Sequence, residues 1–218
     1  MLSKISLFSV ILPIILFVLF YKRNKGGGLW VIFLYCMCSF LADGFYNHFH
    51  NKPDYFFYIY SSFTITEYTL FTVFLYMVLK EKIFKYILIA CSLLFYAIAI
   101  LNIIHKNKES FDSISASLEA ILIIVYGILF LYEQVKDPAI FYVYYSKKFW
   151  IIIAFLLYCS STLFLFIYAA TFTRPDQSTY WVINSVFDII KNLLFAISFT
   201  MKKDKKQSYP MENLYADM

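Results

Sequence analysis

Long apolar runs alternate with short polar connectors along the whole chain. A helix needs about 20 mostly apolar residues to cross roughly 30 Å of hydrocarbon. Seven runs meet this requirement, although the second is short and the fifth begins with polar residues. They lie at about residues 5–21, 29–44, 56–79, 83–104, 114–132, 150–172 and 179–201. The pattern predicts an all-α, polytopic integral membrane protein with seven transmembrane helices.

None of the polar connectors is long enough to fold as a separate domain. We therefore expect a single bundle over residues 1–201 and a tail over residues 202–218 that begins with lysines. The first run follows Lys4, as the apolar region of a signal peptide would follow its basic region. It ends in the basic stretch 21–25 without a small-residue cleavage site, so we expect a retained span.

The composition agrees with a lipid environment. The chain of 218 residues is 61% hydrophobic and 15% charged, whereas soluble domains carry roughly a quarter charged residues. All four cysteines fall inside apolar runs and show no metal-ligand spacing, so we expect neither a disulfide framework nor a cysteine metal site. The net charge is +5, and nearly all of the basic residues that produce it lie at the ends of spans. The basic residues therefore face lipid headgroups, and we expect no nucleic-acid partner.

The distribution of the basic residues predicts an orientation. With seven spans, one side of the membrane holds Lys22, Arg23, Lys25, Lys80, Lys82, Lys85, Lys136, Lys147, Lys148, Lys202, Lys203, Lys205 and Lys206. The other side holds only Lys4, Lys52, Lys106, Lys108 and Arg174. Because basic residues favour the cytoplasmic side, we expect the N-terminus outside and the C-terminus in the cytoplasm of a bacterium, with the spans in its inner membrane. This topology leaves only Lys191 unexplained.

Four charged side chains fall inside predicted spans and away from their ends: Glu67, Glu119, Asp188 and Lys191. Each costs about 2.5–3.5 kcal/mol at the bilayer centre unless it finds a partner or a cavity. On the seventh span, Asn184, Asp188, Lys191 and Asn192 share one helical face, and Asp188 and Lys191 can touch at i,i+3. These six residues (the four charged ones and the two asparagines) form the predicted site.

Polar stripes on two further spans point toward the same interior. The third span carries Ser61, Thr64, Glu67 and Tyr68, and the fifth carries Ser115 and Glu119 on one face. Three carboxylates cannot all stay ionised beside one lysine, so we expect Glu67 or Glu119 to be protonated or to share a proton. Two interpretations stay open. The residues line an outward-facing cavity or a proton-responsive switch, or they only hold the helices together.

Known metal and retinal sites do not fit the histidines and the lysine. His48 and His50 are a weak zinc candidate on a short loop, where solvated side chains are the favoured interpretation. Seven-span zinc hydrolases place histidines on late spans, but no histidine follows position 105. Retinal proteins space the seventh-span aspartate and lysine by four residues, whereas Asp188 and Lys191 are three apart. We therefore expect no cofactor.

Several degenerate motifs resemble a family of uncharacterised seven-span proteins of Bacteroidota that are often found near histidine kinases. These motifs are "ITEYTLF" in the third span, "ESFDSISASLEAILIIVYGILF" at the fifth, "KKFWIIIAFLLYCSSTLFLFI" at the sixth and "NLLFAISF" at the seventh. The resemblance covers most of the chain. It emphasises Glu67, Ser113, Ser160 and Asn192, and it implies a sensory or regulatory membrane module.

The leading functional hypothesis is a non-enzymatic sensory or regulatory protein that signals to a cytoplasmic partner through the 133–149 loop and the tail. The spans lack the Gly/Pro-interrupted half-helices and the repeated halves that many transporters use. A membrane-embedded enzyme or proton-coupled carrier that uses the same carboxylates is the first alternative. A structural accessory subunit of a membrane complex is the second.

Overall fold

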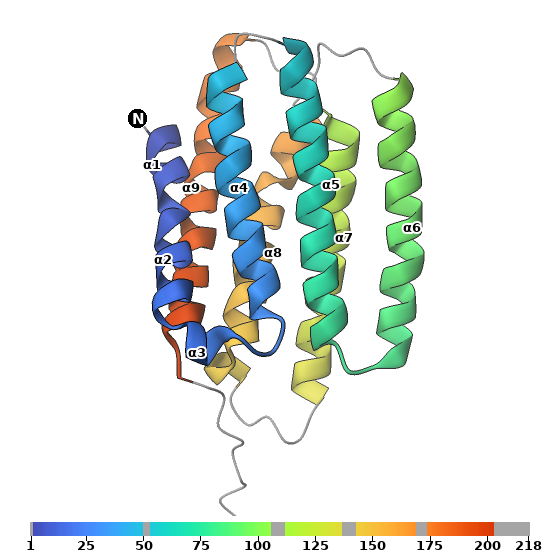
Figure 1. Cartoon of the computed structure of the whole chain (residues 1–218). Helices are drawn as coiled ribbons and strands as arrows, with labels where there is room; N and C mark the ends of the chain where they lie inside the picture. The colour runs from blue at the N-terminus through green and yellow to red at the C-terminus, as the bar shows by residue number, and fades with distance from the viewer. Residues whose placement is uncertain (1, 50–52, 106–111, 137–142, 169–173, 203–218) are drawn as a thin grey trace, which may run out of the picture.

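Every regular element in the described part of the chain is helical, and no strand occurs there (Figure 1). The computed structural model describes residues 2–49, 53–105, 112–136, 143–168 and 174–202. Its elements are α1 (Leu2–Ser9), α2 (Ile11–Leu19), α3 (Tyr21–Asn24), α4 (Leu29–Phe49), α5 (Pro53–Val78), α6 (Lys82–His105), α7 (Ser113–Lys136), the 3₁₀ turn η1 (Val143–Tyr145), α8 (Lys147–Tyr168) and α9 (Arg174–Thr200). The all-α class is therefore confirmed.

The first apolar run forms two helices instead of one. α1 ends at Ser9 and α2 begins at Ile11. Pro13 explains the break, because it has no backbone N–H and its ring would clash with the carbonyl of Ser9, four residues earlier. At the break, the Ser9 hydroxyl donates a hydrogen bond of 2.6 Å to the carbonyl of Ser6. The expected single span at 5–21 is therefore a kinked segment that continues into α3.

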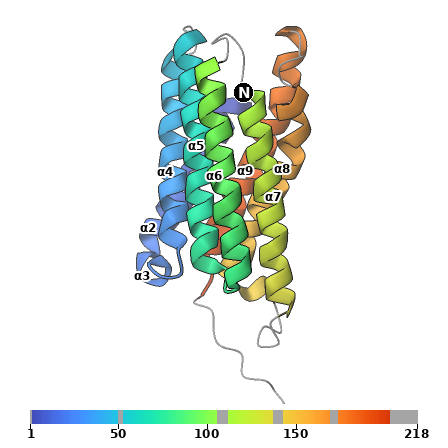
Figure 2. The same ribbon diagram turned by 90° about the vertical axis from the view of Figure 1, so that its right-hand side faces the viewer.

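Successive long helices run in opposite directions, so their ends gather at two ends of the bundle (Figures 1 and 2). One end holds α3, the α5–α6 junction, the start of α8 and the end of α9. We call it the basic end, because its segments carry Lys22, Arg23, Lys80, Lys82, Lys136, Lys147 and Lys148. The opposite end holds the start of α1 and the end of α4. The alternating directions agree with successive helices that each cross the same membrane.

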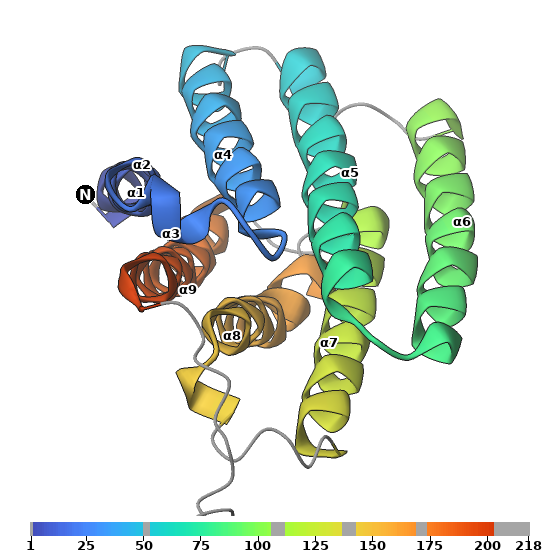
Figure 3. The same cartoon turned by 60° about the horizontal axis from the view of Figure 1, so that its bottom comes forward.

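The long helices form two layers (Figure 3). One layer contains α4, α5 and α6, and the other contains α9, α8 and α7. The α1–α2 segment stands at the side, where it packs on α9, and its α2 part also packs on α4. α7 joins the layers by packing on both α5 and α6. The chain thus brings its first and last described helices into direct contact.

Aromatic rings fill the space between the layers at α4, α5, α8 and α9. The ring of Tyr35 lies 5.3 Å from that of Phe155 and 5.9 Å from that of Phe195, centre to centre. Phe71 lies 4.0 Å from Phe155. All four side chains are almost fully buried. Such ring pairs contribute about 0.5–1.5 kcal/mol each beyond their buried area. This aromatic cluster therefore holds α4, α5, α8 and α9 together.

A buried lysine joins three helices at the basic end. Lys147, 3% exposed, begins α8, and its Nζ donates to Oδ1 of Asn24 at 2.7 Å and to the carbonyl of Arg23 at 3.3 Å. Asn24 in turn donates to the carbonyl of Phe199 at 3.0 Å, and Ser198 donates to the carbonyl of Lys147 at 3.0 Å. From the sequence, Lys147 is expected only at the basic flank of a span. It is in fact a buried link between α3, α8 and α9.

A buried carboxylate caps the turn between α5 and α6. Both oxygens of Glu133 accept hydrogen bonds of 2.9 Å from the backbone N–H of Lys80, and Oε1 also accepts one of 2.6 Å from the N–H of Glu81. N–H groups at the start of a helix lack intrahelical partners and favour negative charge. Glu133, on α7, therefore fixes the beginning of α6.

Length and composition support a membrane setting. Four helical stretches of the described residues can cross a membrane: Lys82–His105, Ser113–Lys136, Lys147–Ile167 and Trp181–Thr200. Two apolar helices are shorter, Lys4–Leu19 and Leu29–Phe45. α5 is absent from both groups because its serines, threonines and Glu67 lower its hydropathy. On the outer face of α6, Leu93 and Leu94 remain 68% and 62% exposed, as expected for a surface that faces lipid.

Candidate functional site

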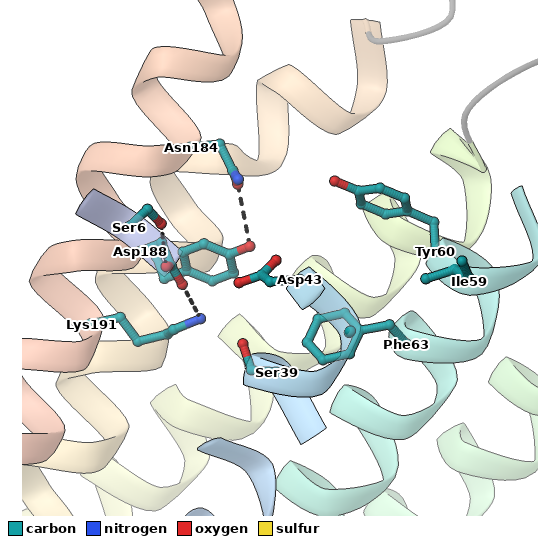
Figure 4. A pocket seen from close by; sticks show the side chains of 11 residues that line it. Ser6, Ser39, Asp43, Ile59, Tyr60, Phe63, Asn184, Asp188 and Lys191 are labelled. Atoms are coloured by element: carbon teal, nitrogen blue, oxygen red, sulfur yellow. Dashed lines mark hydrogen bonds and ion pairs between the residues drawn. The ribbon is translucent and has the colours of Figure 1, made fainter. Parts of the chain in front are cut away.

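A cavity lies between α1, α4, α5, α8 and α9, in the half of the bundle away from the basic end (Figure 4). Its volume is about 80 Å³, which exceeds the roughly 10–15 Å³ that one water molecule needs. The lining residues are Ser6, Ser39, Ala42, Asp43, Ile59, Tyr60, Phe63, Tyr158, Asn184, Asp188 and Lys191. Polar groups from both layers therefore face one small space.

The α9 face of the cavity contains the ion pair that the residue spacing predicts. Nζ of Lys191 lies 2.7 Å from Oδ1 of Asp188, one helical turn away. The Lys191 side chain is 2% exposed, whereas that of Asp188 is 14% exposed. Asp188 thus forms the solvent-facing side of the pair, and the ammonium group lies deeper in the protein.

Two tyrosine rings surround the Lys191 ammonium group. Its Nζ lies 4.1 Å from the ring centre of Tyr158 and 5.1 Å from that of Tyr35. It also donates a hydrogen bond of 2.6 Å to the Tyr35 hydroxyl. Cation–π contacts contribute about 2 kcal/mol or more where the cation is desolvated. Lys191, the basic residue that the topology leaves unexplained, therefore contacts Asp188, Tyr35 and Tyr158.

The Tyr35 hydroxyl carries the network across to α5. It accepts from Lys191 and donates a hydrogen bond of 2.8 Å to Oε1 of Glu67. A continuous path thus runs from Asp188 at the cavity through Lys191 and Tyr35 to Glu67. Glu67 is predicted for the site from its position in a span, whereas Tyr35 is not, because one tyrosine among 20 gives no local signal.

The first helical segment closes the other side of Asp188. The Ser6 hydroxyl donates a hydrogen bond of 2.6 Å to Oδ2 of Asp188. The amide of Asn192 donates to the Ser9 hydroxyl at 2.8 Å and to Oδ2 of Asp188 at 3.3 Å. The two serines lie on α1, which the charge analysis did not connect to the site. Asp188 therefore accepts hydrogen bonds from Ser6 and Asn192 in addition to its ion pair with Lys191.

Asn184 belongs to the rim of the same site. Its Oδ1 accepts a hydrogen bond of 3.2 Å from the Tyr158 hydroxyl, and its side chain lines the cavity (Figure 4). Five of the six predicted residues, namely Glu67, Asn184, Asp188, Lys191 and Asn192, thus contact the cavity or its hydrogen-bonded extension.

Glu119 is the predicted residue that stays outside these contacts. It lies on α7, is 6% exposed, and its Oε1 has no hydrogen-bond partner among the described residues. It does not line the cavity, but it lies within electrostatic range of Glu67 and Lys191. A buried oxygen without a partner costs about 1–3 kcal/mol, so its state requires an explanation.

The histidine metal candidate is not testable in the described structure. His50 and the side chain of His48 lie outside the described residues. Elsewhere, over the described residues, no three histidine, cysteine, aspartate or glutamate side chains gather in a way that could hold a metal ion. The site is thus characterised by hydrogen bonds and an ion pair.

The arrangement provides two kinds of chemistry. The cavity offers water-accessible carboxylate and amide oxygens at Asp188 and Asn184, which can bind water or a small polar solute. Behind it, the Asp188–Lys191–Tyr35–Glu67 path consists of groups that exchange protons, joined by hydrogen bonds of 2.6–2.8 Å. Both features require α4, α5 and α9 to keep their positions relative to one another.

Comparison with known proteins leaves this geometry as the basis for assigning a function. No protein-family model matches the chain, and searches of curated proteins and of solved structures found no match. Of the positions that the Bacteroidota resemblance emphasises, Glu67 and Asn192 lie in the network. Ser113 is buried at the start of α7, and Ser160 is exposed on α8.

Proposed function

We propose that the protein is a non-enzymatic sensory or regulatory membrane protein of the bacterial inner membrane. Seven helical segments cross the membrane, with the N-terminus outside and the basic end in the cytoplasm. The input acts on the cavity at Asp188 and Lys191, and a cytoplasmic protein receives the output. The observation that carries this proposal is the buried ion pair of 2.7 Å that forms one wall of the cavity, in the half of the bundle away from the basic end.

The orientation rests on the charges of the two ends. The described segments at the basic end contain Lys22, Arg23, Lys80, Lys82 and Lys148, among other basic residues. Cytoplasmic loops are enriched in lysine and arginine. A fluorescent protein fused after the tail should therefore fluoresce in the cytoplasm, and alkaline phosphatase at the same position should be inactive. The reverse result would refute the orientation.

A receptor-like role agrees with the position of the cavity better than a carrier does. The cavity occupies one half of the bundle, and the Tyr35, Phe71, Phe155 and Phe195 rings pack beneath it. A carrier with alternating access would require these four rings to separate, so that the cavity opens toward the basic end. A sensor only needs α9 to shift by a small amount, as helices do at switching interfaces.

The route for the output follows α9 to the basic end. Asp188 and Lys191 lie in the cavity, and two turns further on the carbonyl of Phe199 accepts the hydrogen bond from Asn24. Asn24 binds Lys147, which begins α8 shortly after η1 and lies within the 133–149 segment. A displacement of α9 at the cavity would therefore move the segment that we assign to the cytoplasmic partner.

A comparison in the source bacterium tests this function. Compared at equal membrane levels, the chromosomal variant Asp188→Asn should change the transcription of the same genes as a deletion of the whole gene. Ser160→Ala, at an exposed position on α8, is the control and should resemble the wild type. A deletion that abolishes the uptake or export of a solute, with transcription unchanged, would refute the sensory proposal and favour the carrier.

A further inference from the structure

Glu119 presents a buried oxygen that no described group satisfies. Its side chain is 6% exposed on α7, and its Oε1 lacks a hydrogen-bond partner. An ionised carboxylate in this position would be an unpaired buried charge, which proteins avoid by neutralising the group. The bilayer around the bundle increases the cost of such a charge.

Among the described residues, Glu67 on α5 and Lys191 on α9 lie within electrostatic range of Glu119. The Tyr158 hydroxyl and the Cys159 thiol on α8 lie within the same range. On α6 the basic residues Lys82, Lys85 and His105 lie near the helix ends, and Tyr86, Cys91 and Tyr96 are the other titratable residues of that helix.

Among the described residues near Glu119, the cation Lys191 already contacts two other groups. Lys191 contacts Asp188 at 2.7 Å and donates to Tyr35 at 2.6 Å. Glu67 receives the hydrogen bond from Tyr35. Lys191 therefore balances Asp188 directly, and Glu67 through Tyr35 in part. The described residues offer no further positive charge to a second inner carboxylate, so Glu67 and Glu119 together require a proton.

We propose that Glu67 and Glu119 form a proton-binding site that holds one proton at neutral pH and exchanges it with the cavity through Tyr35 and Lys191. The ligand of the protein is then the hydrogen ion itself, and the Asp188 carboxylate is the entry point. This inference deepens the proposed function by naming the input. It depends on that function only for the access of the cavity to the outside.

The hydrogen-bond directions define how the empty site is filled. The Tyr35 hydroxyl gives its proton to Oε1 of Glu67, and the Lys191 ammonium group gives a proton to the Tyr35 oxygen. The Lys191 amine then takes a proton from cavity water through Asp188. The tyrosine and the lysine end unchanged, so the net event is one proton moved from the cavity to Glu67, which lies within electrostatic range of Glu119.

Infrared spectroscopy of the full chain in lipid nanodiscs tests the site. A protonated carboxylic acid has a C=O stretching band that is separate from carboxylate bands. We expect this band in the wild type at neutral pH, its loss in Glu119→Gln, and a shifted band in Glu119→Asp. Glu81→Gln, at an exposed position, is the control and should keep the band. A wild type without the band, or a folded Glu119→Gln with the band unchanged, would overturn the proposal.

Tyr35→Phe tests the route separately from the site. This variant keeps the ring between Phe155 and Phe195 but removes the hydroxyl that joins Lys191 to Glu67. We expect the carboxylic acid band to persist and to exchange its proton for deuterium more slowly than the wild type. Exchange at the wild-type rate would refute the route. Neither infrared result depends on transcription, so the proton site and the sensory function fail independently.

Discussion

Lys191 and Asp188 form an ion pair of 2.7 Å within one turn of α9, and Lys191 is 2% exposed. Removing one member of a buried pair costs about 3–5 kcal/mol, because the other charge stays buried without compensation. We therefore expect Lys191→Met to lower the free energy of unfolding by about 3 kcal/mol. Thermal and denaturant unfolding of the purified protein in detergent measures this loss.

The double variant decides whether the two residues act as a pair. Lys191→Met with Asp188→Asn removes both charges, so its loss of stability should be clearly smaller than the sum of the two single losses. Additive losses would show that Lys191 and Asp188 contribute through separate neighbours.

Lys147 should contribute far more to stability than Lys148, although the two are adjacent. Lys147 is 3% exposed and binds Asn24 and the carbonyl of Arg23. Lys147→Met leaves the Asn24 oxygen and that carbonyl without their donor, at a cost of about 1.5–3 kcal/mol. Lys148→Met removes the same charge from the same flank, so it controls for topology and should change the melting temperature little. Equal effects of the two variants would contradict the buried role.

Glu133 should stabilise the start of α6 through its charge. Glu133→Gln keeps the shape of the side chain but replaces one of the two oxygens that accept from Lys80 and Glu81. Charge-assisted hydrogen bonds contribute about 1.5–3 kcal/mol, so we expect a loss of roughly 1–2 kcal/mol. Hydrogen exchange at the α5–α6 turn should also become faster. Glu81→Gln is the matched control, and an equal effect there would refute the capping role.

At Gly127, α7 packs closely against Leu156 of α8. A Cβ atom at this position would lie 2.8 Å from Cδ2 of Leu156, whereas one at Gly44 would have nothing within 4 Å. Overpacking a well-filled interface costs about 1–3 kcal/mol. Gly127→Val should therefore lower the melting temperature, and Gly44→Val, which makes the same change in helix propensity, should not. Partial rescue of Gly127→Val by Leu156→Ala would identify the clash as the cause.

Local patterns predict the helices and the α9 face, and the reason is physical. Apolar runs of helical length have few other ways to satisfy the backbone in lipid. The three-residue spacing of Asp188 and Lys191 places them on neighbouring turns whatever surrounds them. The kink before Pro13 is equally local, and attention to the residue four positions before the proline would have found it.

Contacts between distant segments could not be predicted in the same way. Ser6 and Asp188 are 182 positions apart, and nothing in either neighbourhood indicates the other. Tyr35 and Lys147 have the residue types of an ordinary span and an ordinary basic flank, so only packing assigns their roles. The charge count identified Glu119 as a residue that needs a partner. Its isolation follows from how α7 is set against α5 and α8.

The packing of α1 against α9 has a consequence for biosynthesis. The ribosome makes α1 before α9, and the five long helices α4 to α8 are made between them. Ser6 and Ser9 therefore have no Asp188 or Asn192 to bind until α9 has been made. During this interval the α1 hydroxyls lack their partners on α9. The wall of the cavity is therefore among the last parts of the molecule to form, and a chain released before α9 would enter the membrane without a site.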